Sequence, residues 1–183
     1  MDPRPPESLD LGEVVLRRHR PADAAALAAT AADCLDHLTP WMVWATPELV
    51  TVEAMATFIS DSSRRAADGS EAVYGILTPA GALVGGCGLH DRGAPRTVEI
   101  GYWLHPSATG RGAMTRIVTA LADLALAMDD VGAAAVVCDE ANERSAAVAR
   151  RAGFRLDRIV DSPRPQAPAD TGRDMIWLRT APS

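Results

Sequence analysis

The chain has 183 residues, of which 48% are hydrophobic and 23% are charged, and its net charge at pH 7 is −6. A chain of this length can bury roughly 70% of its unfolded surface, so one domain over residues 1–183 can form a full core without a metal ion or a disulfide. The acidic balance, the lack of a membrane-spanning run and the lack of a secretory signal exclude nucleic-acid and membrane partners and predict a cytoplasmic protein.

The first third of the chain predicts a strand and two helices behind a flexible tail of residues 1–11. Apolar periodicity and turn residues place these elements at Val14–Leu16, from Pro21 to about Asp36, and from about Glu48 to Ala67. The two helices are separated by a predicted loop, His37 to Pro47. Asp68 and Gly69 are expected to end the second helix.

The rest of the chain predicts three strands in a meander, followed by alternating helices and strands. The meander is expected at Ala72–Leu77, Leu83–Leu89 and Thr97–Leu104. Then follow a helix at Ala113–Met128, a strand at Ala134–Cys138, a helix at Asn142–Ala152, a strand from Phe154, a mobile Pro-rich loop at 161–172 and a strand at Asp174–Leu178. The strand–helix–strand crossover between residues 97 and 138 makes its two strands parallel neighbours in an otherwise antiparallel sheet. The expected fold class is therefore α+β.

A glycine-punctuated turn connects the strand that ends at Leu104 to the helix that begins at Ala113. Gly110 and Gly112 can adopt backbone angles closed to other residues, so successive N–H groups can converge at the positive end of that helix. Such a turn either binds a diphosphate or only joins a strand tightly to a helix. The residues alone leave both interpretations open.

A second glycine cluster, Gly85-Gly86-Cys87-Gly88, resembles a dinucleotide fingerprint only superficially. A helix would have to follow it, and Asp91, Gly93 and Pro95 interrupt any helix there. We predict instead a close backbone approach or a bulge within a strand.

The basic residues and the cysteines exclude two further kinds of site. All eighteen basic residues are arginine, and a Walker-type phosphate loop needs a lysine. Cys34, Cys87 and Cys138 are odd in number and too scattered for a disulfide framework or a zinc site. We therefore predict no metal, and the cysteines are expected to be small core residues.

The order of several motifs resembles the GCN5-related N-acetyltransferase superfamily, and within it the branch that includes the ribosomal-protein N-terminal acetyltransferases. The likeness covers about residues 12 to 180 and rests on Glu99-Ile-Gly-Tyr-Trp-Leu-His-Pro, Gly110-Arg-Gly-Ala-Met-Thr115, Asn142-x-x-Ser145 and Ala152-Gly153-Phe154. It implies a mixed, mostly antiparallel twisted sheet of about seven strands with about four helices. It also implies that acetyl-CoA lies where the two parallel strands splay apart, and that a primary amine attacks the thioester directly.

The resemblance assigns the acetyl-CoA contacts to the turn, to the strand before it and to the helix that Asn142 begins. The implied residues are Trp103, Leu104, Thr109, Gly110, Arg111, Gly112, Ala113, Met114, Thr115, Asn142 and Ser145. Main-chain amides from Gly110 to Thr115 would bind the diphosphate, with Arg111 adding charge at the rim. Thr109 departs from the family pattern, because it lacks the amide or guanidinium found there. Asn142, the only asparagine, could instead serve simply as a helix N-cap.

Two proton transfers need candidate residues. Strand alternation puts Val98, Ile100, Tyr102 and Leu104 on one face and Glu99, Gly101 and Trp103 on the other. Glu99 is either a base on the acceptor side or a solvated outward charge, with His90 and Asp91 as rivals for the base. The tyrosine that many relatives use as the acid falls on Ala149 here. Ser145 is therefore the candidate acid, with helix capping as its alternative role and Tyr102 as a second candidate.

The acceptor is expected to bind at the loop after the first helix. His37, Trp41, Trp44 and Tyr102 are its candidate contacts, and the tryptophans could hold a cationic amine by cation–π attraction of ~0.5–2 kcal/mol. Alternatively, one or both tryptophans fill the core, and we expect one in each role. The acceptor would be a protein N-terminal amine or a small amine. A non-catalytic CoA-binding module is the competing hypothesis, and the family branch makes a homodimer plausible.

Overall fold

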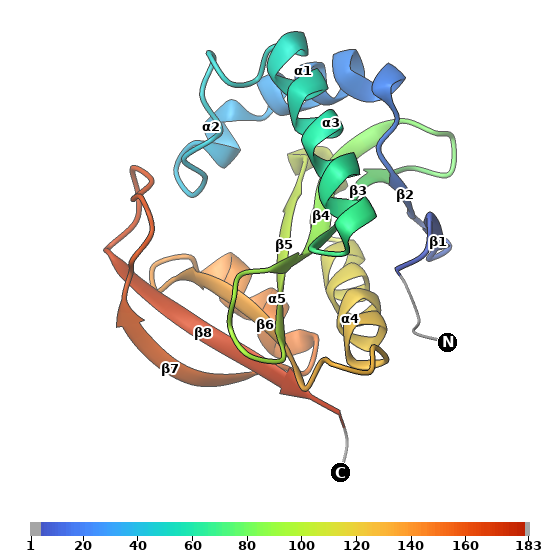
Figure 1. Ribbon diagram of the computed structural model, residues 1–183. Coiled ribbons are helices and arrows are strands. Elements are labelled where there is room, and N and C mark those ends of the chain that lie inside the picture. Colours follow the sequence, from blue (N-terminus) through green and yellow to red (C-terminus); the bar gives the residue numbers. More distant parts are fainter. Residues whose placement is uncertain (1–4, 182–183) are drawn as a thin grey trace.

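The computed structural model describes residues 5–181. These residues form a single eight-stranded sheet in the order β1-β2-β3-β4-β5-β6-β8-β7, together with five α-helices and two short 3-10 helices (Figure 1). Only the β5–β6 pair is parallel within this sheet. The α+β fold expected from the sequence is confirmed, with one strand and one helix more than predicted.

The bounds of the elements follow the sequence signals closely in most places. The strands are β1 (Ser8–Asp10), β2 (Val15–Arg18), β3 (Glu71–Leu77), β4 (Leu83–Asp91), β5 (Thr97–Leu104), β6 (Ala133–Asp139), β7 (Arg155–Asp161) and β8 (Arg173–Thr180). The helices are η1 (Pro21–Asp23), α1 (Ala24–Asp33), α2 (Leu35–Leu38), α3 (Val52–Asp68), η2 (Pro106–Ala108), α4 (Ala113–Leu126) and α5 (Glu143–Arg151). Within residues 5–181, none of these helices is long and apolar enough to cross a membrane.

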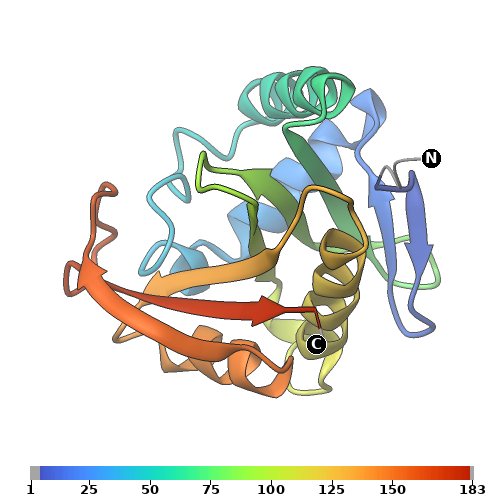
Figure 2. The same cartoon turned by 60° about the horizontal axis from the view of Figure 1, so that its bottom comes forward.

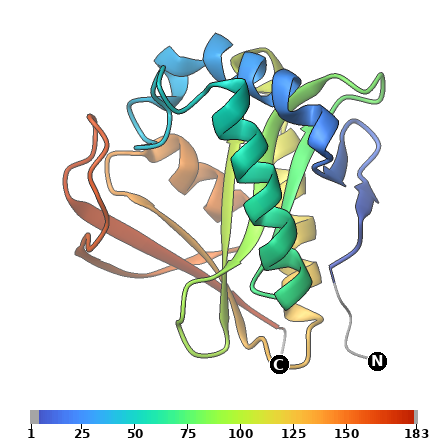
Figure 3. The ribbon, with the colours of Figure 1, turned by 45° about the horizontal axis from the view of Figure 1, so that its top comes forward.

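Helices cover both faces of the sheet. Figure 3 shows α3 in front of the central strands and α4 behind them. The α4 side holds the larger core, in which Ile117, Val118 and Leu121 are fully buried at helical spacing. The α1–α3 side holds a smaller cluster that includes Leu27 and Ile59. Both layers fix the central strands β4 and β5, which carry much of the site described below.

The start of the chain differs from the expected flexible tail. Residues 8–10 form β1, which pairs antiparallel with β2 and aligns Leu9 with Leu16. Leu9 packs against the main core, and the Tyr74 hydroxyl donates a hydrogen bond to the Pro6 carbonyl at 2.8 Å. These contacts order the segment, and they join residues too distant in sequence for a local pattern to indicate. Residues 1–4 lie outside the described part of the chain.

The first helical region is divided into shorter pieces than predicted. Cys34 has φ −119° and ψ 21°, which is not helical, so α1 ends at Asp33 and α2 begins at Leu35. The predicted loop therefore starts after α2 rather than at His37. The next helix, α3, begins at Val52 rather than Glu48, because the Thr51 side chain caps it by accepting a hydrogen bond from the Ala54 amide.

Other expectations about the core are confirmed. Cys34, Cys87 and Cys138 are buried and free. The glycine cluster lies within β4, where a Cβ at Gly85 would come within 2.4 Å of the Trp103 carbonyl and no helix follows. The dinucleotide interpretation is therefore excluded, and the close backbone approach is correct.

The parallel pair β5–β6 is short, and this creates a wedge in the sheet. The two strands pair only from Thr97 with Ala133 to Glu99 with Ala135. Beyond these positions β5 stays paired with β4 as far as Leu104, while β6 stays paired with β8 as far as Asp139. Figure 2 shows β6, β8 and β7 curving away from the central strands. The predicted splayed pair is thus present.

The 162–172 connection between β7 and β8 is bound to the rest of the fold by carboxylates. Asp139, at the end of β6, is 4% exposed and accepts hydrogen bonds from the Thr171 amide at 2.8 Å, the Gly172 amide at 3.2 Å and the Ala141 amide at 2.9 Å. The Ala169 amide also donates to the Pro40 carbonyl at 3.0 Å, which joins this loop to the segment after α2. The expected mobile surface loop is therefore anchored at several points.

Replacing Asp139 with asparagine should lower the free energy of unfolding by about 2–3 kcal/mol, because an amide group cannot accept every bond that the carboxylate accepts. Burial acts to raise the pKa of Asp139, but its hydrogen bonds outweigh burial and hold the pKa below the ordinary value. The carboxylate therefore stabilises the fold above the ordinary pKa, and this contribution is lost as pH falls through the lower folded-state pKa. Urea unfolding at pH 7 and at pH 3 tests this.

The exposed Asp130 provides a matched control for that substitution. An asparagine there should leave the free energy of unfolding within about 0.5 kcal/mol of the parent protein. If the Asp139 variant is as stable as the Asp130 variant at pH 7, the hydrogen-bonded carboxylate does not anchor the loop.

Candidate active site

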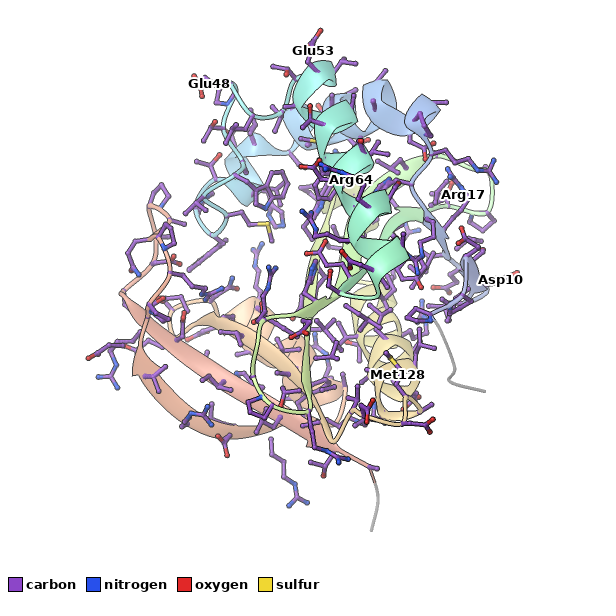
Figure 4. All side chains as sticks on the ribbon, in the orientation of Figure 1. Asp10, Arg17, Glu48, Glu53, Arg64 and Met128 are labelled. Atoms are coloured by element: carbon purple, nitrogen blue, oxygen red, sulfur yellow. The ribbon has the colours of Figure 1, made fainter. Side chains whose placement is uncertain are left out.

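The wedge opens into a cavity of about 1650 Å³. Its wall is built by the turn before α4, the start of α5, the exposed parts of β4 and β5, and the segment between α2 and α3. Figure 4 shows side chains from that segment and from the β7–β8 hairpin pointing into the space between them, while the labelled Glu48 and Glu53 point away. Every site residue that the sequence singled out lines this cavity except Arg111. Arg111 is exposed outside it.

The turn before α4 has the geometry of an anion cradle. Gly110 and Gly112 have φ values of 81° and 75°, in the left-handed region, and Gly112 is the N-cap of α4. Within residues 5–181, the main-chain amides from Gly110 to Thr115 donate to no other group, and the first helical bond runs from the Arg116 amide to the Gly112 carbonyl. Free amides at the positive end of a 14-residue helix fit a diphosphate.

The side chain before the cradle does not add to it. The Thr109 hydroxyl donates to the Pro106 carbonyl at 2.7 Å, so its hydrogen is already in use. The backbone of β5 beyond Glu99 has no strand partner on the β6 side. Trp103 and Leu104 lie in this unpaired stretch and line the cavity. An extended ligand chain could therefore pair with β5 as an added strand does.

Three side chains meet where β5 approaches the start of α5. Asn142 caps α5, since its side-chain oxygen accepts a hydrogen bond from the Ser145 amide at 3.1 Å. The Tyr102 hydroxyl lies 2.8 Å from the Ser145 hydroxyl and also donates to the Ser145 carbonyl at 3.3 Å. Burial raises the pKa of the Tyr102 phenol, so it is protonated at neutral pH. This corner of the cavity therefore holds two neutral hydroxyl donors.

The position to which the family resemblance assigns a tyrosine carries no acid here. Ala149 is fully buried in α5, one helical turn after Ser145. The phenol near the start of α5 comes instead from Tyr102, on a different element. The sequence placed Tyr102 on the same strand face as Val98, Ile100 and Leu104, and that placement is confirmed because all four belong to or pack against the α4-side core.

The opposite face of the sheet carries the acidic residues. Glu99 and His90 are direct neighbours across β4 and β5 and both line the cavity. The Glu99 carboxylate lies 3.9 Å from Arg92 Nε, and its side chain is 23% exposed. Asp91, the other rival for the base, accepts a hydrogen bond from the Gly93 amide at 2.8 Å in an exposed turn.

Aromatic residues close the acceptor end of the cavity. Trp44 packs edge-on against Trp103, with ring centroids 5.9 Å apart, and also against the small cluster around Leu38. Trp41 is half-buried and lines the cavity. His37 lies nearby in α2, and burial together with the Arg144 charge lowers its pKa, so it is neutral at pH 7. Trp44 thus has a packing role in the core and also lines the cavity, whereas Trp41 lines the cavity without a comparable aromatic contact among the described residues.

Several charged residues of the cavity wall are indicated by no sequence motif, among them Glu71 and Arg164. Glu71 lies at the start of β3 and bonds to His90, and Arg164 comes from the β7–β8 loop and pairs with the buried Asp174 at 2.6 Å. Neither residue belongs to a motif, and each reaches the cavity only through the sheet pairing. A charged residue at the end of an apolar strand was the only available signal for Glu71.

Known proteins share both the sequence pattern and the fold. A family model described as "Acetyltransferase (GNAT) domain" matches residues 13–155. The Bacillus subtilis (strain 168) protein named "Putative ribosomal N-acetyltransferase YdaF" is 30% identical over 142 residues, which is 77% of each chain. The microcin C7 self immunity acetyltransferase MccE, solved in complex with acetyl-CoA and AMP, has a TM-score of 0.86 at 19% identity and covers 97% of this chain and 98% of its own. Mycobacterium smegmatis RimJ, solved with CoA-disulfide, has a TM-score of 0.80 at 25% identity and covers 92% of this chain and 82% of its own.

Proposed function

Since this chain belongs to the GNAT acetyltransferase family and is therefore an enzyme that uses acetyl-CoA, we propose that its acceptor is a primary amine that attacks the thioester directly. The acceptor would be the α-amino group of a protein N-terminus or a small amine. The observation that carries the proposal is the single cavity that joins the amide cradle before α4 to an aromatic and acidic acceptor face.

Direct attack by the amine is supported by the protonation state of the two cysteine thiols that line the cavity. Cys87 and Cys138 line it, and burial raises the pKa of both thiols. A protonated, buried thiol is a poor nucleophile, so neither cysteine is suited to carry the acetyl group. The amine nitrogen then forms its bond to the carbonyl carbon while the bond from carbon to sulfur breaks.

The residues around the cavity divide into three proposed tasks. Amides from Gly110 to Thr115 hold the diphosphate, and the β5 backbone near Trp103 and Leu104 aligns the pantetheine arm. Ser145 donates a hydrogen bond, and then a proton, to the departing sulfur. The Glu99 carboxylate faces the acceptor side, where it attracts an ammonium group.

The nature of the acceptor is proposed from the cavity wall and from the relatives. Trp41, Trp44 and His37 form an apolar, aromatic entrance that suits an extended peptide or a flat small molecule. The relative named "Putative ribosomal N-acetyltransferase YdaF", 30% identical over 142 residues, favours a peptide N-terminus. We therefore place N-terminal peptides first among the acceptors.

A titration and an acetylation screen test this proposal. Acetyl-CoA should bind with a dissociation constant in the micromolar range, measured by isothermal titration calorimetry. Thiol release should then appear with a subset of N-terminal peptides or small amines and should be absent with the same peptides blocked at the α-amino group. CoA binding without thiol release across the whole panel would favour the competing hypothesis of a non-catalytic CoA-binding module. Absence of CoA binding at millimolar concentration would reject both.

Two further expectations of the sequence stay predictions. Cell fractionation tests the proposed cytoplasmic location, and light scattering tests the proposed homodimer.

A further inference from the structure

Glu71, His90 and Arg65 form a hydrogen-bonded row on the acceptor side of the sheet. Glu71 Oε1 lies 3.0 Å from His90 Nδ1, and Glu71 Oε2 lies 2.6 Å from Arg65 Nε. The Glu71 side chain is only 9% exposed and the His90 side chain 15%. All three residues line the cavity, yet none is explained by acetyl-CoA binding.

Glu71 fixes the orientation of the His90 ring. Burial acts to raise the pKa of Glu71, but hydrogen bonds from His90 and Arg65 outweigh burial and hold the pKa below the ordinary value. An ionised carboxylate only accepts hydrogen bonds, so His90 must donate its Nδ1 hydrogen to Glu71. The other ring nitrogen, Nε2, is then left with a free lone pair in the neutral ring.

The His90 ring can lie close to β4 and β5 because two glycines beneath it have no side chains. A Cβ at Gly88 would lie 3.0 Å from Nε2, and a Cβ at Gly101 would lie 3.2 Å from it. The ring therefore lies against β4 and β5 at positions that have no side chains. Gly101 stands between Glu99 and Trp103 on the acceptor face of β5, and all three residues line the cavity, so Nε2 lies beside that part of the cavity.

We propose that His90, held by Glu71, is the base that accepts the proton of the acceptor amine, a role that rests on the acetyl transfer proposed above. The arrangement is that of a carboxylate orienting an imidazole base. Glu99, which lies opposite His90 across the strands, then holds the incoming ammonium group rather than removing its proton. Asp91 is not suited to the task, because its carboxylate is bonded within its own turn.

The proton balance of the reaction is complete with these groups. His90 Nε2 takes one proton from the ammonium group, which leaves a free amine lone pair for attack. As the bond between nitrogen and carbon forms and the bond between carbon and sulfur breaks, sulfur takes a proton from the hydroxyl corner. The nitrogen loses its second proton as the bond from carbon to sulfur breaks, and this proton restores the hydroxyl corner through solvent. The proton held by His90 is released, so one proton in all goes to solvent. His90 lines the cavity, and it passes its proton to solvent through that space.

The pH dependence of acetyl transfer should depend on the charges that face His90. These are Glu71 on β3, which bonds to the ring, and Glu99 on β5, its direct neighbour across the strands. Arg65 on α3 and Arg92 after β4 act through these two carboxylates. Removing the Glu71 charge should disfavour the imidazolium form of His90. The acid limb of the profile of kcat/KM against pH should then move to lower pH.

The test compares His90→Gln, Glu71→Gln and Glu99→Gln by thiol release between pH 5.5 and 9, with CoA binding measured alongside. We expect His90→Gln to lower kcat/KM about 100-fold at pH 7 and to abolish the acid limb, with CoA affinity unchanged within about twofold. Glu71→Gln should lower kcat/KM less and shift the acid limb to lower pH. Glu99→Gln should mainly raise KM for the acceptor. Added imidazole should partly restore the rate of His90→Ala, where the ring has left a gap against Gly88 and Gly101.

His105→Gln is the matched control, because His105 also bonds to a carboxylate, Asp33 at 2.9 Å, but lies outside the cavity lining. Its kcat/KM should stay within twofold of the parent enzyme. A His90→Gln enzyme that keeps its rate within threefold and retains the acid limb would overturn the proposal. The proposal would also be overturned if Glu99→Gln lost both the rate and the acid limb while His90→Gln kept them. If the parent enzyme binds CoA but acetylates no amine, the proposed function fails instead, and that result is visible before any variant is made.

Discussion

Replacing Gly112 with valine is expected to weaken CoA binding about 1000-fold, equivalent to about 4 kcal/mol. Gly112 has φ 75° and is the N-cap of α4, so a β-branched side chain would force the backbone out of the left-handed region. The free amides from Gly110 to Thr115 would then no longer converge on one point. Each charge-assisted hydrogen bond to the diphosphate contributes about 1.5–3 kcal/mol, so losing two of them accounts for the effect.

The matched control is Gly69→Val, at the other end of the sheet from the cradle. Gly69 has φ 85° and caps α3, and an added Cβ there meets nothing within 4 Å. Both variants should lose about 1–2 kcal/mol of unfolding free energy from backbone strain, but only the Gly112 variant should lose CoA affinity. Titration calorimetry and thermal unfolding separate the two effects. Equal CoA affinity in both variants would show that the cradle does not bind the diphosphate.

The local parts of the site were predictable from the sequence, because each of them is encoded within a few neighbouring residues. Two glycines between a predicted strand and a predicted helix indicate the turn at Gly110 and Gly112. The capping role of Asn142 likewise needs only the three residues that follow it. The parallel pair could also be expected, since a strand–helix–strand crossover joins parallel strands, whereas the wedge between them was implied only by the family resemblance.

The contacts between distant segments could not be read from the sequence. Tyr102 and Ser145 are 43 residues apart, and their hydroxyl contact depends on how α5 packs beside β5. Glu71 and His90 meet only because β3 and β4 pair in the register that aligns them. The division of the first helical region at Cys34 is a similar case, because no glycine or proline between residues 31 and 38 marks it in the sequence. Chemistry that arises from such contacts becomes visible only in three dimensions.

Removing both hydroxyl groups from the corner between β5 and α5 should lower kcat about 1000-fold. Ser145→Ala removes the proposed donor to sulfur, and Tyr102→Phe removes the phenol that lies 2.8 Å from it. Each single variant should lower kcat about 100-fold, the range that one missing transition-state donor or acid produces. CoA affinity should change little, because the α5 cap uses the Ser145 amide rather than its hydroxyl. The readout is thiol release at saturating concentrations of both substrates.

Tyr74→Phe and Ser107→Ala are the controls for the two substitutions. The buried Tyr74 also donates a hydrogen bond, to the Pro6 carbonyl, and Ser107 also bonds to a neighbouring side chain, His105, but neither residue lines the cavity. Tyr74→Phe should cost about 1 kcal/mol of stability, and both controls should leave kcat unchanged. A double variant of Tyr102 and Ser145 that keeps kcat within threefold would show that the sulfur leaves without help from this corner.

The size of the double effect distinguishes two ways in which the hydroxyl groups can act. If each group donated to sulfur independently, the two losses would multiply to about 10,000-fold. The phenol of Tyr102, however, also donates to the Ser145 carbonyl at 3.3 Å, and its raised pKa keeps it protonated at neutral pH. One hydroxyl therefore orients the other, so the loss of either already removes part of what both supply. A double-mutant cycle that falls about tenfold short of multiplicative would identify Tyr102 and Ser145 as a single donor unit, assembled from a strand and a helix where the customary position, Ala149, carries no hydroxyl.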